Sequence, residues 1–166
     1  MADAKIGRSA ANDKSLLRSP SGWHNDAWQR PSRHDQIQQD LLTFLRTRPL
    51  AGVPAGVAVA RLVEGEYPIL RGGQIIAYCD AIEILTVNLF ASVSIFEVKP
   101  DVGAPFAALR QCKALLQLAK ECVQADTHTL HLVVPHDAIG IATLRENWPH
   151  VWAWGAKFDA QSDSLP

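Results

Sequence analysis

Asp80 and the run Glu97-Val98-Lys99 are the residues whose types and spacing could do chemistry. Asp80 precedes the glutamate by seventeen residues, and Lys99 follows it by two. Mg²⁺ typically takes one or two carboxylates from a protein and completes its shell with water and phosphate oxygens. An ammonium group beside such acids can orient or deprotonate an attacking water and offset charge in the transition state. The combination predicts a metal-dependent site that hydrolyses phosphodiester bonds.

Both groups lie on segments that favour strands. Residues 74–85 and 90–99 are rich in β-branched and aromatic side chains. With a turn at Asn88-Leu89, an antiparallel hairpin places Asp80 opposite Glu97, where cross-strand partners lie about 5 Å apart. Glu97 and Lys99 share one face of their strand because they are two residues apart. The hairpin is therefore expected to assemble the three side chains.

The remaining elements follow from hydrophobic periodicity and from helix and turn signals. Ser32 and Asp35 form a capping box that begins a helix, and Pro49 ends it. Pro105 begins a second helix that runs to about Gln124. Further strands are expected at 57–63, 129–134 and 151–154, and a short helix at about 137–146. This order predicts an α/β (α+β) fold, in which a mixed sheet is flanked by helices in a single core domain.

Composition sets the class of protein. The chain has 166 residues, of which 48% are hydrophobic and 20% charged, as in an ordinary globular domain. A net charge of −1 gives no overall basic surface but leaves room for a local basic groove. The three cysteines show no metal-ligand spacing and are expected to be reduced, buried thiols. No apolar run spans a membrane, and the start lacks a secretory signal, which predicts a cytoplasmic protein.

Three regions differ in character. Residues 1–31 are polar and unperiodic and are predicted to form a flexible N-terminal arm, in which Trp23 and Trp28 are the only large anchors. Residues 32–158 hold the predicted core domain, and residues 159–166 form a polar C-terminal tail.

The pattern resembles the PD-(D/E)xK nuclease superfamily of restriction enzymes, Holliday-junction resolvases and repair exonucleases. The likeness covers roughly residues 32 to 134, and Cys79 stands where the family name has proline. It includes Glu97-Val98-Lys99-Pro100 and Ala108-Leu109-Arg110-Gln111, which look like the E-V-K-P and L-R-Q pattern of some bacterial and phage members.

The resemblance implies a restriction-endonuclease-like fold and a DNA nuclease activity. It implies Mg²⁺, with Mn²⁺ as a substitute, held by Asp80, Glu97 and the backbone carbonyl of Val98. Lys99 then activates water, and Gln111 helps to shape the site. The family usually has an acid on its first helix, where Asp40 is preferred. Other acids stay open for this place: Asp35, to which a capping role is also assigned, and Glu64 and Glu66 near the end of the first strand.

Further residues are assigned to binding. Arg110, Lys113 and Arg71 are the expected contacts to nucleic acid, and His34 could approach the site from the first helix. Trp152 and Trp154 share one strand face, and either complete the core or expose a surface for a homodimer or larger complex. The alternative function is a non-catalytic nucleic-acid-binding or assembly module on the same fold.

Overall fold

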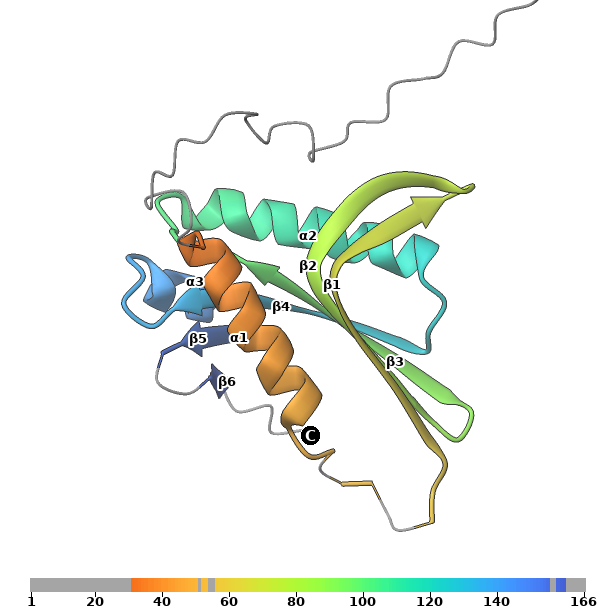
Figure 1. Cartoon of the computed structure of the whole chain (residues 1–166). Coiled ribbons are helices and arrows are strands. Elements are labelled where there is room, and N and C mark those ends of the chain that lie inside the picture. Colours follow the sequence, from red (N-terminus) through yellow and green to blue (C-terminus); the bar gives the residue numbers. More distant parts are fainter. Residues whose placement is uncertain (1–30, 51, 54–55, 156–157, 161–166) are drawn as a thin grey trace, which may run out of the picture. The chain divides into compact units, whose positions relative to one another are not determined.

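The computed structural model describes residues 31–50, 52–53, 56–155 and 158–160. Residues 1–30 of the predicted arm, with Trp23 and Trp28, and residues 161–166 of the predicted tail lie outside this part. Within it, six strands form one sheet in the order β1-β2-β3-β4-β5-β6. Helix α1 covers one face of the sheet, and α2 and α3 cover the other (Figure 1). The predicted α/β fold with a mixed sheet and flanking helices is confirmed.

The first three strands form an antiparallel meander that carries the candidate acids. They are β1 (Val59–Arg71), β2 (Gln74–Val87) and β3 (Phe90–Val98). Gly72 and Gly73 join the first pair with φ angles of +58° and +80°, the left-handed conformation that a two-residue hairpin turn requires. Asn88 has a φ of 56° in the second turn, where Val87 pairs with Phe90. The predicted turn and register of this second hairpin are confirmed.

The rest of the sheet combines parallel and antiparallel neighbours. It comprises β4 (Thr127–Pro135), β5 (Val151–Trp154) and the short β6 (Asp159–Ala160). Strand β4 runs parallel to both β3 and β5, whereas β6 pairs antiparallel with β5. Strand β6 uses the first two residues of the predicted polar tail, so the sheet extends slightly beyond the expected domain boundary at 158.

Two of the three helices in the described ranges begin where the sequence signals place them, and the third begins about four residues later than expected. They are α1 (Arg33–Thr47), α2 (Pro105–Cys122) and α3 (Ile141–Asn147). The capping box of α1 is formed in both directions, from Asp35 N–H to Ser32 Oγ at 3.1 Å and from Ser32 N–H to Asp35 Oδ2 at 3.2 Å. Helix α3 is shorter than expected because Gly140 directly before it is left-handed. No helix in the described ranges is long and apolar enough to cross a membrane.

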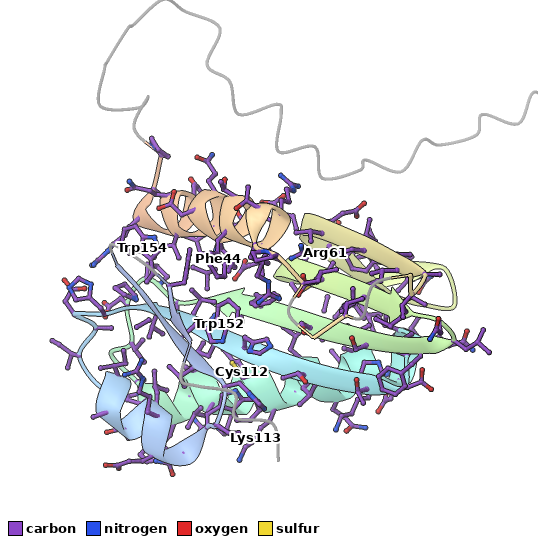
Figure 2. All side chains as sticks on the ribbon, turned by 90° about the horizontal axis from the view of Figure 1, so that it is seen from below. Phe44, Arg61, Cys112, Lys113, Trp152 and Trp154 are labelled. Carbon is purple, nitrogen blue, oxygen red and sulfur yellow. The ribbon has the colours of Figure 1, made fainter. Side chains whose placement is uncertain are left out.

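Two apolar layers hold the helices to the sheet. Ile37, Leu41 and Leu45 of α1 pack on the face that presents Phe96 and Trp152. The α2 and α3 layer includes the following buried residues from helices and strands: Leu109, Cys112, Ala119, Leu144, Ile82, Val93, Ile95 and Leu132. Phe44 of α1 meets the ring of Trp152 edge-on, and Figure 2 shows both between the helix and the sheet.

Trp152 belongs to this core rather than to a surface. Its exposed fraction is 3%, and Trp148 is also buried. Of the two alternatives for the tryptophans, the core role is therefore correct for Trp152. The prediction that Trp152 presents an association surface is wrong, because its ring is enclosed by α1 and β3 side chains. Trp154 is half-buried.

The meander opens at Asp80. Pairing between β2 and β3 ends at Ala81 with Phe96, so Asp80 is the first residue beyond the paired stretch. Cys79 and Ile82 both pack in the α2 layer, although residues three apart in a regular strand point to opposite faces. On the other side Glu66, across from Asp80, has a φ of 48°. Strand β2 is thus distorted where it leaves β3, and this gap holds the candidate site.

Candidate active site at the β2–β3 divergence

Three hydrogen-bonding groups hold Asp80 in place. The backbone N–H of Val98 donates to Asp80 Oδ2 at 2.6 Å. Because strand pairing has ended, the carboxylate takes the place of a strand carbonyl as the acceptor of this N–H. On the α1 side, Gln38 Nε2 donates to the carbonyl oxygen of Asp80 at 2.6 Å, and His34 Nε2 lies 3.1 Å from Asp80 Oδ1. The position of Asp80 is therefore fixed from both β3 and α1.

Glu97 and Lys99 form an ion pair at the end of β3. Lys99 Nζ donates to Glu97 Oε1 at 2.8 Å, and the two side chains are 26% and 17% exposed. Alternation along β3 puts them on the face of Val93 and Ile95, which pack toward α2. The backbone N–H of Lys99 donates to the carbonyl of Val133 on β4 at 2.9 Å, which fixes the strand end.

The electrostatics show that the two acids lie close enough to repel. Burial and then the negative charge of Asp80 raise the pKa of Glu97, and they outweigh the opposing effects of Lys99 and His34. Burial opposes the charge on Lys99, yet the hydrogen bond and charge of Glu97, with the charge of Asp80, raise its pKa overall. Lys99 is therefore protonated at neutral pH. The predicted assembly of Asp80, Glu97 and Lys99 by the hairpin is thus supported by register, hydrogen bonding and charge.

Two thiols border the site without contributing reactivity. Burial, followed by the charges of Asp80 and Glu97, raises the pKa of Cys79 to about 12. Burial and the charge of Glu97 likewise raise the pKa of Cys112 to about 12. Figure 2 shows Cys112 pointing from α2 toward the sheet. Both cysteines are free and buried, as expected, and their neutral thiols are poor nucleophiles and metal ligands.

The donor set fits a hard, hydrated cation better than zinc. In the described part of the chain, no three His, Cys, Asp or Glu side chains gather closely enough to hold a metal ion by themselves. Mg²⁺ does not require such a cage, because it retains several waters and uses one or two carboxylates with substrate phosphates. The protein ligands of Mg²⁺ would be Asp80, Glu97 and the backbone carbonyl of Val98, the residue directly after Glu97.

The other acids considered from the sequence have other partners or are exposed. The Asp40 carboxylate accepts a hydrogen bond from Trp154 Nε1 at 3.0 Å and lines a cavity of about 460 Å³ between α1 and β5. Asp40 therefore does not join Asp80. Asp35 acts as the helix cap, and its Oδ1 also lies 3.6 Å from Nδ1 of His34, the ring that contacts Asp80. Glu64 and Glu66 are exposed on β1.

The polar residues predicted on α2 are exposed, and they face different directions. Gln111 and Lys113 are two positions apart and so project about 200° apart around the helix. Gln111 flanks the buried stripe that includes Cys112, whereas Arg110 lies on the outer side. Figure 2 shows Lys113 pointing away from the sheet. Arg71 is paired with Glu121 at the far end of α2.

Gln38 is the site residue that sequence reasoning missed. It is nearly buried, and it sits three residues before Leu41 and seven before Leu45, within the apolar stripe of α1. A polar side chain inside such a stripe was the available signal. His34, four residues earlier, lies on the same helix face, and its expected approach to the site is confirmed.

Comparisons with protein-family models, with curated proteins and with solved structures gave no match. A functional assignment therefore rests on the side chains of the site and on the resemblance of the sequence pattern.

Proposed function

We propose that this protein is a divalent-metal-dependent nuclease that hydrolyses phosphodiester bonds in DNA. The observation that carries the proposal is the grouping of Asp80, Glu97 and Lys99 at the point where β2 leaves β3. Perturbed titration of partly buried acids is typical of functional sites, and Glu97 has a raised pKa with Asp80 as one cause. DNA as the substrate follows from the resemblance to the PD-(D/E)xK nucleases.

Each side chain has a role that its contacts support. A bound Mg²⁺ supplies a polarised phosphate and an activated water. Asp80 and Glu97 would hold the cation, and the N–H of Val98 and the side chains of α1 keep Asp80 oriented. Lys99 is charged, which favours orienting the water and offsetting the charge of the transition state over accepting a proton.

The test is metal-dependent cleavage of linear, circular, single-stranded and branched DNA. Cleavage is expected with Mg²⁺ or Mn²⁺ and not with EDTA. Lys99→Ala is expected to lower the rate by about 10²–10³, the range for loss of one group that stabilises charge in the transition state. Lys120→Ala is the matched control, because Lys120 is exposed on the last turn of α2.

A second pair of variants separates catalysis from binding. Glu97→Gln keeps the size of the side chain but removes the metal-binding charge, and Glu146→Gln is its exposed control. The proposal is wrong if folded Lys99→Ala and Glu97→Gln cleave as well as the native protein. DNA binding without cleavage, unchanged by Asp80→Ala and Glu97→Ala, would instead favour the non-catalytic binding module.

A further inference from the structure

The β1–β2 hairpin extends past the end of β3 as a two-stranded ribbon. Its paired residues run from Tyr67 with Cys79 to Arg71 with Gln74, and β3 pairs only from Ala81 onward. One face packs on the α2 layer through Tyr67, Ile69, Ala77 and Cys79. Figure 1 shows this ribbon arching over α2.

The opposite face of the ribbon is apolar and exposed. Tyr78 is 58% exposed, and Pro68 is its direct partner on β1. Leu70 and its partner Ile75 are also exposed, as is Ile76, which is left unpaired where the register shifts between Ile69 and Leu70. Tyr78 stands two residues before Asp80 on the same strand, a separation of about 7 Å. The apolar face therefore reaches Asp80, whose carboxylate lies 3.1 Å from His34 of α1, whereas Glu97 and Lys99 lie on the other face of the sheet.

The ribbon is poor in groups that bind phosphate. Between Tyr67 and Cys79 the sequence holds one charged residue, Arg71, and that guanidinium is paired with Glu121. Duplex DNA presents phosphates outward and keeps its base faces stacked inside. Unpaired bases, in contrast, stack on aromatic side chains with little dependence on sequence.

We infer that this ribbon face binds unpaired bases, so that the substrate is a single-stranded segment of DNA with a base stacked on Tyr78. The inference rests on the proposed function, because it assigns the substrate class to that site. A base stacked on Tyr78 leaves its phosphate near Asp80. A second copy of the chain on the same face would instead cover the approach to Asp80, and continuity with this acid therefore favours the nucleic acid.

The experiment measures binding of a fluorescent single-stranded oligodeoxynucleotide, and of its duplex, to the full chain in EDTA. Tyr78→Ala is expected to weaken single-strand binding about tenfold, as loss of one stacking partner does. Tyr78→Phe should restore it, and duplex binding should change little. Phe106→Ala is the matched control, because Phe106 is also 58% exposed but lies on α2.

The outcomes separate this inference from the proposed function. Single-strand binding that is absent, or equal in Tyr78→Ala and the native protein, overturns the inference even if metal-dependent cleavage is found. Tyr78-dependent binding without any cleavage sustains it and sinks the nuclease proposal. A concentration-dependent dimer in sedimentation that Tyr78→Ala abolishes, with DNA binding unchanged, assigns the face to a second copy and also overturns it.

Discussion

Asp80 and Glu83 lie three residues apart on β2, and each belongs to a different cluster of charged side chains. Glu83 is 5% exposed and meets two guanidinium groups, Arg48 and Arg61, the latter through Nε at 2.7 Å. Asp80 instead faces a second acid, Glu97, whose single cationic partner at the end of β3 is Lys99. The first group has more cations than acids, and the second has more acids than lysines.

The group around Glu83 has a structural purpose. Arg61 also donates to the carbonyls of Leu45 and Arg48, which are at the end of α1 where helix carbonyls lack intrahelical partners. The Arg48 guanidinium lies 5.6 Å from the ring centroid of Trp152. Glu83 thus ties the helix end to the sheet. At Asp80 and Glu97, burial and the repulsion between two acids outweigh the cationic partners and raise the pKa of Glu97, and a perturbed acid of this kind is characteristic of a functional site.

The largest stability effect is expected at the structural cluster. Glu83→Ala leaves two partly buried guanidinium groups without their acid, so the free energy of unfolding should fall by about 3 kcal/mol. Urea denaturation measures this change, and Glu64→Ala on exposed β1 is the control, expected within about 0.5 kcal/mol of the native value. DNA cleavage per folded molecule should be unchanged. Comparable losses of unfolding free energy in both variants would mean that Glu83 contributes no more to stability than an exposed acid does.

Metal binding should stabilise the folded protein only when the cluster of Asp80 and Glu97 is intact. At a Mg²⁺ concentration one hundred times the Kd, a ligand that binds only the folded state adds about 2.7 kcal/mol. Thermal unfolding with increasing Mg²⁺ should therefore show a rising Tm for the native protein and for the Glu64→Ala variant, but little change for Glu97→Gln. An equal rise in all three proteins would place the cation away from Glu97.

The acid pair could be anticipated from the sequence because its geometry is local. Asn88 accepts a left-handed conformation in a two-residue turn, and this turn length fixes the register of the whole hairpin. From that register, Asp80 must arrive beside Glu97. The capping box of α1 and the proline start of α2 are equally local and were also predicted correctly.

The parts that sequence reasoning did not find depend on how a helix lies across the sheet. Gln38 reaches Asp80 from 42 positions away, and Arg48 reaches Glu83 from 35. The choice of Asp40 as the first-helix acid assumed that the edge of the apolar stripe faces the site. In the structure, that edge faces Trp154, whereas His34 and Gln38 face Asp80. Helix periodicity gives the buried face but not the strand that it meets.

The smallest expected effect is the pH dependence of stability at Glu97. Because burial and Asp80 raise its pKa, the folded protein holds this proton to a higher pH than the unfolded chain does. The stabilising contribution of the proton on Glu97 is fully present below the ordinary glutamate pKa of about 4.3. It is lost as the pH rises through the pKa of Glu97 in the folded protein. Glu97→Gln lacks this titration. In metal-free buffer the variant should be more stable than the native protein at pH 7.

Urea midpoints between pH 4 and pH 8 measure the difference, which should close as the pH falls toward 4. The sign is informative because the two clusters predict opposite results. Neutralising an acid whose ion pairs stabilise the fold, as at Glu83, lowers the stability of the protein at neutral pH. Neutralising an acid whose charge is opposed by burial and repulsion, as at Glu97, raises it. A Glu97→Gln variant that is less stable than the native protein at pH 7 would mean that the Lys99 pair outweighs burial and the charge of Asp80. Glu97 would then be a structural ion-pair partner like Glu83, and the contrast between the two clusters would fail.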